Sequence, residues 1–273
     1  MTSRPPQMTD RNALLRQRAR AARDPVLFLH EEAAREIEER LAEVNKAFTS
    51  PALVGNVTAP FRRLLPDAPI IPDADRLDFT GPHDLLVHAF GLHWADDPVG
   101  QIVQSRLALV PDGLFLAVLF GGQTLHELRA SLAEAETRLT GGLSPRVLPM
   151  ADVRELGALI QRGGLALPVA DSVRLTVRYR DLPRLIHDLR GMGETNALAA
   201  RHRRVPPKAL FALAERLYSE AFADPEGFLP ATFELVFLTG WAPSDTQQTP
   251  LRPGSAKARL ADALNTRETP LDD

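Results

Sequence analysis

The chain has 273 residues, of which 44% are hydrophobic and 25% are charged, as in an ordinary soluble globular protein. This length suffices for one large α/β domain with its own core. A net charge of −3 provides no overall basic field for nucleic acid, and the absence of cysteine excludes disulfides, cysteine-ligated zinc, iron–sulfur clusters and a thiol nucleophile. We therefore expect no nucleic-acid partner.

The apolar segments predict neither a membrane span nor a secretion signal. The longest apolar run, residues 114–120, is far shorter than the roughly 20 residues that cross a bilayer. The N-terminus lacks the apolar core of a signal peptide. Residues 11–23 are arginine-rich, as in a transit peptide, but Asp10 and Asp24 count against that interpretation. We expect a cytoplasmic protein without a transmembrane segment.

The N-terminal part is expected to form a loose end and two helices. Pro5 and Pro6 favour a loose segment over residues 1–9. Residues 11–23 predict a basic helix. We favour a helix whose arginines are solvated, and the alternative is that they lie against an acidic partner or a membrane surface. Residues 26–48 place apolar side chains at helical spacing, which predicts an amphipathic helix leading into the domain.

The middle of the chain alternates short apolar runs with helical patterns. We expect strands in "PALVGN", "APIIPDADRLDF", "HDLLVHAFGLHW" and "LFLAVLFGG". We expect helices in "APFRRLLPD" and in "DPVGQIVQSRLALVPDG", the second stopped by Pro111 and Gly113. Strands that alternate with helices predict an α/β fold with a mainly parallel sheet covered on both faces.

The second half predicts more helices and two more strands. Helices are expected in "GQTLHELRASLAEAETRL", where Thr124 is a candidate cap, in "DVRELGALIQRGGL", in "LPRLIHDLRGMG" and in "PKALFALAERLYSEAFAD". Gly163 and Gly164 suit a left-handed helix end. Strands are expected in "PVADSVRLTVRYRD" and "PATFELVFLTGWAP", the latter as an antiparallel edge strand, and the tail after Pro250 looks irregular.

Several motifs together resemble a known family. The order of "PDADRLDF", "HDLLVHAFGLHW", "PDGLF", "FGGQTLHELR", "GGLSPRV", "LGALIQRGG", "LRGMGETNAL" and "PATFELVFLTGW" over residues 10–258 is similar to class I S-adenosylmethionine-dependent methyltransferases of the type-11 group. More closely, it resembles the methyltransferase-like assembly factors of respiratory complex I, whose mitochondrial member is implicated in hydroxylating an arginine of a complex I subunit. The resemblance implies S-adenosylmethionine as cofactor and a client protein as partner.

The resemblance also implies a domain organisation. The expected fold is a Rossmann-like class I methyltransferase fold with a shortened N-terminal half and added C-terminal helices. Residues 1–24 are expected to be a basic, partly flexible segment, and residues 25–250 the methyltransferase-like domain, with a family-specific C-terminal region over 123–250. Residues 251–273 are the irregular tail.

The resemblance assigns the cofactor site to loops that follow the predicted strands. Its expected residues are Gly55, Asp73, Ala74, His93 and Trp94, with Asp73 facing the adenine amino group. In the family, the first strand ends in an acid and a glycine-rich turn, which lets the backbone approach the cofactor. Here Leu53 stands where the acid belongs, and Gly55 is the one glycine of the turn.

The chain is also short at this point. Only 29 positions separate Gly55 from Asp84 (84 − 55), where the family has a further strand ending in the acid that binds the ribose hydroxyls. Each charge-assisted hydrogen bond from such an acid contributes about 1.5 to 3 kcal/mol. We therefore predict that binding of S-adenosylmethionine is weakened or lost.

No catalytic residue can be assigned from the sequence. His93 and Trp94 contact the cofactor or, equally, cap the next helix and cover the sheet edge. His88 suits a core or surface position, and Asp96 and Asp97 suit a helix N-terminus. His126 and Glu127 have the chemistry of an acid–base pair or metal ligands, but no ligand stands four residues after His126, so we expect no metal site.

The stretch "LRGMGETNALAARHRR" is the candidate for partner recognition. Glycines on both sides of Met192 predict a mobile, exposable segment, and Met192, Glu194 and Asn196 are the expected partner-binding residues. A basic cluster follows over residues 201–204. The alternative is an ordinary loop with solvated charges, in which Glu194 and Asn196 order the backbone.

Three functions are compatible with these patterns. In the first, the protein still acts on an arginine or another nucleophile of a client subunit. In the second, it has lost cofactor binding and only binds the client. More distantly, it is a methyltransferase for small molecules such as biotin precursors or quinones, an inference from fold analogy alone. The departures over residues 53–84 favour the second function.

Overall fold

The computed structural model describes residues 7–247. Described residues up to Pro243 belong to one compact unit, and residues 244–247 belong to a second unit that starts at Ser244. The tail expected after Pro250 lies outside the described residues. No helix in the described part of the chain is long and apolar enough to cross a membrane.

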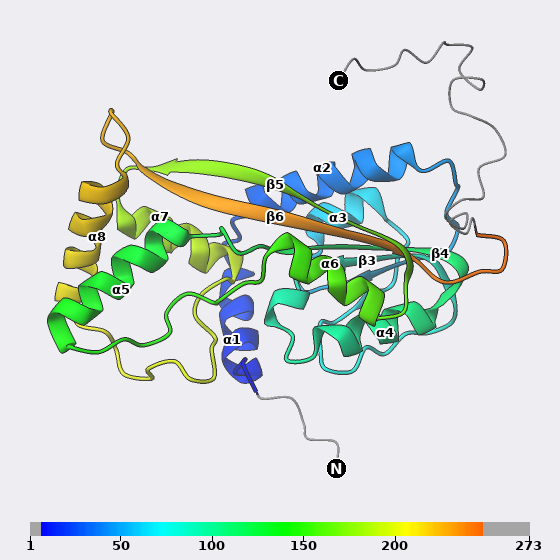
Figure 1. The fold of residues 1–273 in the computed structure, drawn as a ribbon, viewed down its shortest axis with the longest axis horizontal. Helices are drawn as coiled ribbons and strands as arrows, with labels where there is room; N and C mark the ends of the chain where they lie inside the picture. Colours follow the sequence, from blue (N-terminus) through cyan, green and yellow to red (C-terminus); the bar gives the residue numbers. More distant parts are fainter. Residues whose placement is uncertain (1–6, 248–273) are drawn as a thin grey trace, which may run out of the picture. The chain divides into compact units, whose positions relative to one another are not determined.

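The centre of the compact unit is a six-stranded sheet with the order β2-β1-β3-β4-β6-β5 (Figure 1). The first four strands pair in parallel, and β6 pairs antiparallel with both β4 and β5. The late strand was expected at an edge, but β6 lies inside the sheet and β5 forms the edge. The strands are β1 (Pro51–Val54), β2 (Ile70–Ile71), β3 (His83–Ala89), β4 (Leu109–Phe120), β5 (Ala166–Tyr179) and β6 (Leu229–Trp241).

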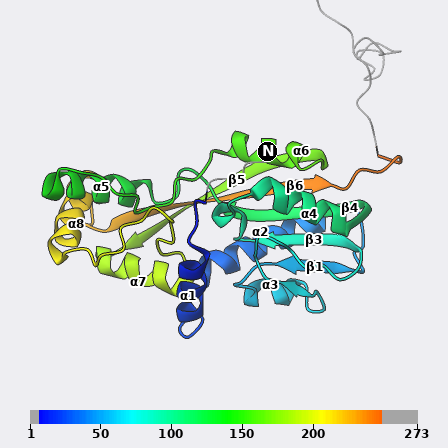
Figure 2. The ribbon, with the colours of Figure 1, turned by 90° about the horizontal axis from the view of Figure 1, so that it is seen from below.

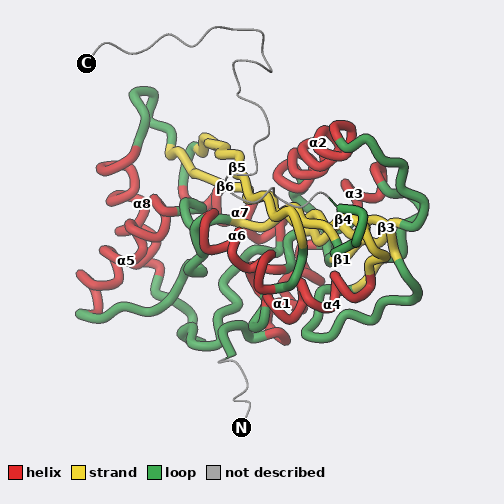
Figure 3. Tube along the Cα trace, turned by 45° about the vertical axis from the view of Figure 1, so that its right-hand side comes forward, coloured by secondary structure: helices red, strands yellow, loops and turns green. Residues whose placement is uncertain are grey.

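Helices cover both faces of this sheet, as the alternating pattern predicts. On one face, α2 (Phe28–Glu43) and α3 (Ala59–Leu64) bury Leu29, Ile37 and Phe61. On the other, α4 (Pro98–Ala108) and α6 (Val153–Arg162) bury Ile102 and Ile160. Figure 2 shows α3 and α4 on opposite sides of the strands, and Figure 3 shows the same layers by secondary structure. The α/β fold class is confirmed.

The last two strands extend beyond the rest of the sheet. Phe120, the last residue of β4, pairs with Leu235 of β6, whereas Leu229 at the start of β6 pairs with Tyr179 of β5. Three helices pack at this end of the strands in Figure 1, and these are the expected added C-terminal helices. They are α5 (His126–Thr140), α7 (Leu182–Met192) and α8 (Lys208–Phe222).

The shortened first half is also confirmed. Between β1 and β3 the chain forms one short helix, α3, and the two-residue strand β2. Because β2 pairs directly with β1, the described sheet has no further strand between them.

The N-terminal helix α1 (Arg11–Ala21) packs into the unit rather than standing apart from it. It contacts α7, and Leu14 and Arg18 are buried. The described residues before it are not loose, since Thr9 forms an antiparallel bridge with Leu198. The preferred expectation, a solvated arginine face, is therefore wrong for Arg18.

Two helix ends differ from the expectation. Helix α4 ends at Ala108, and residues 109–113 already belong to β4. Pro111 and Gly113 lie where the pairing of β4 with β3 is irregular and where Asp112 adopts a positive φ of 62°. Thr124 does not cap α5, because its hydroxyl donates to the Glu234 carbonyl. Asp97 does cap α4, accepting from Gly100 N at 2.8 Å, as expected. The left-handed end of α6 is at Gly164, with a φ of 77°.

Candidate functional site

The parallel strands β1, β3 and β4 all end at one edge of the sheet, which is where ligands bind in open α/β sheets. The residues expected at the cofactor follow these ends. Gly55 follows β1, and His93 and Trp94 lie in the short 3-10 helix η1 (Leu92–Trp94) after β3. We call Gly55, Asp73, Ala74, Phe90 and Gly91 the cradle.

Asp73 is the charged centre of the cradle, and its partners come from α1. Arg11 Nη2 lies 3.1 Å from Asp73 Oδ1, and Arg18 Nη1 lies 3.1 Å from Asp73 Oδ2. The Asp73 side chain is 0% exposed and that of Arg18 is 8% exposed. Burial alone would raise the pKa of Asp73, but Arg11, His88 and Arg18 together outweigh it and hold the pKa below its usual range.

Neighbouring polar groups complete this arrangement. Arg18 Nη2 also donates to the Phe90 carbonyl at 3.2 Å. The Gln101 amide donates to Asp73 Oδ1 at 3.3 Å and to the Ala74 carbonyl at 2.8 Å, while its oxygen faces His88 Nε2 at 2.9 Å. His88 is a core histidine, and burial lowers its pKa. Asp73 and Ala74 are thus engaged by the protein's own side chains.

Gly55 contributes close packing inside the sheet. Its backbone N–H donates to the Ile71 carbonyl at 3.0 Å, and a Cβ added at Gly55 would stand 2.8 Å from the Ala89 carbonyl oxygen. Leu53, where the family has an acid, is fully buried in the core. The need for glycine at this position therefore has an explanation that involves no ligand.

Further contacts hold α1 over the cradle. Asp96 Oδ1 accepts from the backbone N–H groups of Met8 and Thr9 at 2.8 and 2.9 Å. Arg201 pairs with Asp10, the N-cap of α1, at 2.9 Å. These contacts tie the start of α1 both to the β3–α4 loop and to the segment after α7.

His93 and Trp94 meet Glu194 beside the cradle. Trp94 Nε1 donates to Glu194 Oε2 at 2.7 Å, and His93 Nε2 lies 3.1 Å from the same oxygen. Burial opposes ionisation of Glu194, but His93, Arg18 and Trp94 together lower its pKa. The structure thus joins two predicted cofactor residues with a predicted partner residue.

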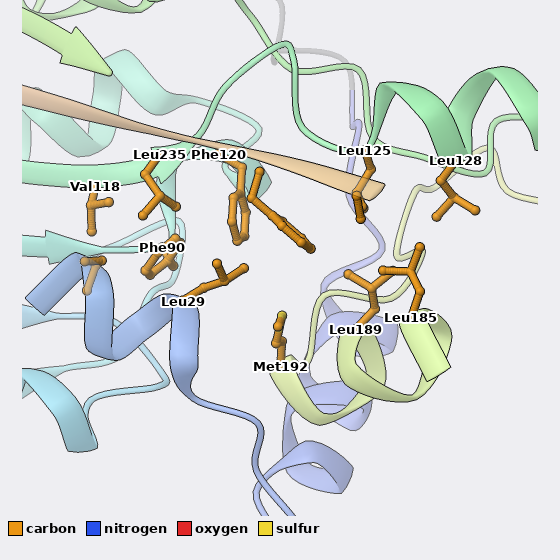
Figure 4. Packing of buried hydrophobic residues seen from close by; sticks show 14 of the residues in the cluster. Leu29, Phe90, Val118, Phe120, Leu125, Leu128, Leu185, Leu189, Met192 and Leu235 are labelled. Atoms are coloured by element: carbon orange, nitrogen blue, oxygen red, sulfur yellow. The ribbon is translucent and has the colours of Figure 1, made fainter. Parts of the chain in front are cut away.

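The segment around Met192 is packed rather than exposable, which corrects the prediction. Met192 is 1% exposed and lies in the core at the end of α7, facing Leu29 of α2 in Figure 4. A Cβ at Gly191 would meet the Val26 side chain at 2.5 Å, and one at Gly193 would meet the Arg18 side chain at 3.0 Å. The two glycines serve close approach, and Gly193 also has a φ of 78°.

Asn196 orders the backbone, as the alternative prediction states. Its amide donates to the Pro145 carbonyl at 2.8 Å, and its oxygen accepts from Leu198 N at 3.0 Å. His202, Arg203 and Arg204 of the following basic cluster are exposed.

A cavity of about 770 Å³ opens next to this network. Its lining comes from α1, η1, the end of β4, α5, the segment between α5 and α6, α7, the segment after α7, α8 and β6. Glu194 and Asn196 line it together with His93, Trp94 and Phe120. We call this space the cavity. In the described part of the chain, no group of three or more acidic or histidine side chains is suited to hold a metal.

His126 and Glu127 touch each other, with His126 Nδ1 3.4 Å from Glu127 Oε2, but neither lines the cavity. Glu127 is buried and accepts from Thr232 N at 3.2 Å, whereas the His126 side chain is 44% exposed and its ring also contacts the Gln123 carbonyl. The site roles of Arg11, Arg18 and Gln101 were not predicted from the sequence. The seven-residue spacing of Arg11 and Arg18, on the helix face that carries Leu14, is the sequence signal for the two arginines.

Comparisons with known proteins bear on this arrangement. No family model matches the chain. The chain is 37% identical over 184 residues to "Arginine-hydroxylase NDUFAF5, mitochondrial" of Dictyostelium discoideum, covering 67% of this chain and 42% of that protein. It is 30% identical over 214 residues to malonyl-(acyl-carrier protein) O-methyltransferase of Halorhodospira halophila, covering 77% of this chain and 69% of that protein.

The extent of these matches is partial. The chain spans between 42% and 62% of the length of three NDUFAF5 relatives, from Dictyostelium discoideum, Rattus norvegicus and Danio rerio. Among solved structures, the YcgJ protein from Bacillus subtilis aligns with a TM-score of 0.47 and 12% identity, covering 78% of this chain and 99% of that one.

Proposed function

Because the chain belongs to the class I S-adenosylmethionine-dependent methyltransferase-like family that contains these arginine-hydroxylases and the malonyl-(acyl-carrier protein) O-methyltransferase, we propose that it is a client-binding member whose cradle is closed. The proposed client is a protein subunit of respiratory complex I, as for the assembly factors that the sequence resembles. The proposed activity is binding rather than methyl transfer. A location in the cytoplasm stays a prediction.

The observation that carries the proposal is the pairing of Asp73 with two arginines of α1. Asp73 is the residue expected to face the adenine amino group, yet Arg11 and Arg18 already occupy both of its oxygens. A cofactor bound there would leave Arg18 buried without its carboxylate, and breaking a buried ion pair costs about 3–5 kcal/mol. That cost corresponds to a loss of about two to four powers of ten in affinity. With α1 in this position, the residues do not fit the cofactor as the family holds it.

The remainder of the cradle supports the same conclusion. Leu53 stands where the resemblance places an acid at the end of β1, and between β1 and β3 the described chain has one two-residue strand, β2, where the resemblance implies two strands. Both departures support weakened cofactor binding independently of α1.

The charge of the cavity supports binding over chemistry on an arginine. Six arginines line it, and one of its two acids, Glu194, is already shared by His93 and Trp94. An arginine of a client would enter among like charges, which disfavours it as the reacting group in this space. The six are Arg20, Arg146, Arg190, Arg201, Arg203 and Arg204.

Calorimetric titration with S-adenosylmethionine tests the closed cradle. We expect no binding heat from the purified full chain at millimolar cofactor, and the same for S-adenosylhomocysteine. Saturation in the low micromolar range would contradict the proposal and would favour the alternative, an active methyltransferase acting on a protein or a small molecule.

Capture of purified complex I subunits on the immobilised full chain tests the client. We expect one subunit to be retained without added cofactor. Arg203→Asp with Arg204→Asp should weaken retention because both side chains are exposed beside the cavity, whereas Arg138→Asp, on α5 outside the cavity lining, should not. Retention of no subunit would reject the client.

A further inference from the structure

The interior of the cavity is apolar. Phe120 at the end of β4, Leu128 and Leu132 of α5 and Phe233 of β6 line it, and all four belong to the main hydrophobic cluster. Leu128 on α5 and Leu189 on α7, which Figure 4 labels, also line the cavity. A wall of this kind stabilises a bound hydrocarbon by removing its surface from water.

Basic side chains line the same space. Arg20 comes from α1, Arg190 from α7, and Arg204 from the segment after α7. In the described part of the chain, none of these three has an acidic partner within ion-pair distance, whereas Arg146 pairs with Glu136 and Arg201 with Asp10. Three guanidinium groups therefore remain available to an outside anion.

The two acids that line the cavity do not neutralise these groups. Glu194 is held by His93 and Trp94, and Asp24, exposed after α1, forms no ion pair among the described residues. Even when Glu136 and Asp10, the partners of Arg146 and Arg201, are counted with these two acids, six arginines face four acids and leave a net positive charge around the cavity.

We propose that the cavity is a binding site for an amphipathic organic anion, that is, a hydrocarbon body that ends in a carboxylate or phosphate. The body packs on Phe120, Leu128 and Leu132, and the anionic end pairs with Arg20 and Arg190. The volume of about 770 Å³ lies within the range of roughly 300–1,000 Å³ that holds small organic ligands. Arginine suits this role because its planar fork binds carboxylate and phosphate through paired hydrogen bonds. The proposal depends neither on the client nor on the loss of the cofactor.

Three ligands of equal chain length test the charge requirement. Decanoate, decanol and decylammonium are titrated into the purified full chain by calorimetry at low salt. We expect decanoate to bind at least about tenfold more tightly than decanol, and decylammonium to bind weakest. Decyl phosphate should bind at least as tightly as decanoate, and the ratio of the two affinities tells whether the site prefers a phosphate or a carboxylate.

Variants locate the site. Arg190→Ala and Arg20→Ala should each weaken decanoate about three- to tenfold and leave decanol unchanged, because only the anionic end is affected. Leu128→Trp fills the interior and should abolish binding of all three ligands. Arg138→Ala, an exposed arginine of α5 outside the lining, is the matched control and should bind decanoate like the wild type. Thermal melting establishes that each variant is folded.

The proposal is overturned by any of three results. The first is that decanoate binds no more tightly than decanol. The second is that decanoate does not bind at millimolar concentration. The third is that Arg190→Ala and Arg20→Ala bind decanoate like the wild type. A folded Leu128→Trp variant that still binds decanoate places the site elsewhere and also rejects it.

Discussion

The arginines of α1 meet opposite surroundings at the cradle and at the cavity. Arg18 is buried against Asp73 and the Phe90 carbonyl, whereas Arg20, two residues later, lines the cavity and has no carboxylate partner among residues 7–247. In the cradle the positive charge neutralises an acid that the fold has retained. At the cavity the positive charge is available to an anionic ligand. Arginines of one helix therefore close the cradle and, in our proposal, make the cavity selective for anions.

The largest expected effect is a loss of stability when the ion pair of the cradle is broken. In Asp73→Ala, Arg18 keeps its burial but loses its carboxylate, so the free energy of unfolding should fall by about 3–5 kcal/mol in urea titrations. Asp75→Ala is the matched control, because the Asp75 side chain is 62% exposed and lies 3.7 Å from Arg11. It should change stability by less than about 0.5 kcal/mol. Equal effects of the two substitutions would mean that Arg18 is not held as described.

A pH-dependent loss of stability is the next largest effect. His30 of α2 is buried against Phe90, and neither ring nitrogen has a hydrogen-bond partner in the part of the chain that the structure describes. Burial lowers the pKa of His30 to about 4, Arg18 and His93 also lower it, and Glu194 opposes them. Since the unfolded imidazole titrates near 6.5, the unfolded chain binds more protons between pH 6.5 and 4. Stability should therefore fall by about 3 kcal/mol as the pH falls through that window.

Comparison with a variant isolates this histidine from the carboxylates. In His30→Phe, unfolding measured at pH 7 and pH 4 should show a smaller loss than the wild type, by about 3 kcal/mol. His126→Gln, which replaces a half-exposed ring on α5, should keep the wild-type dependence. If His30→Phe and the wild type lose stability in parallel, the buried neutral histidine is ruled out.

The smallest expected effect is a loss of stability from a change at Glu194, which lies beside the cradle and lines the cavity. Glu194→Gln keeps an acceptor for Trp94 but removes the charge that faces His93, so unfolding should require about 1–2 kcal/mol less. Glu134→Gln is the control, since Glu134 pairs with Arg138 on the surface and both side chains are 52% exposed. Thermal unfolding that ranks Glu134→Gln as the more damaging change would contradict the buried network.

Regular elements were predictable because their periodicity is local. The spacing of Leu29, Ala33 and Ile37 predicts α2, and the apolar run over 114–120 predicts β4, since burial of one face or of a whole strand leaves a direct trace in the sequence. The shortened first half was predictable from the short interval between Gly55 and Asp84, compared with the further strand that the resemblance implies there. The position of β6 inside the sheet was not, because strand order depends on pairings between distant segments.

The cradle was predicted in outline and missed in its decisive detail. Asp73 was expected at the site, but Arg18 was expected in water, because an arginine is buried only when a distant partner compensates it, and Asp73 lies 55 residues further along the chain. The glycines beside Met192 were misinterpreted for a similar reason. A glycine suits a mobile segment or a close contact, and only the packing of Val26 and Arg18 against this segment decides between them.

Hydrogen–deuterium exchange of α1 tests the closed cradle most directly. Peptides covering Arg11–Ala21 are followed in the full chain with and without millimolar S-adenosylmethionine, and Arg18→Ala provides a reference for a loosened helix. We predict slow exchange of these amides in the wild type, unchanged by the cofactor, and faster exchange in Arg18→Ala. Fast exchange in the wild type, or a change in the protection of α1 when the cofactor is added, would show that the cradle opens and would contradict this account.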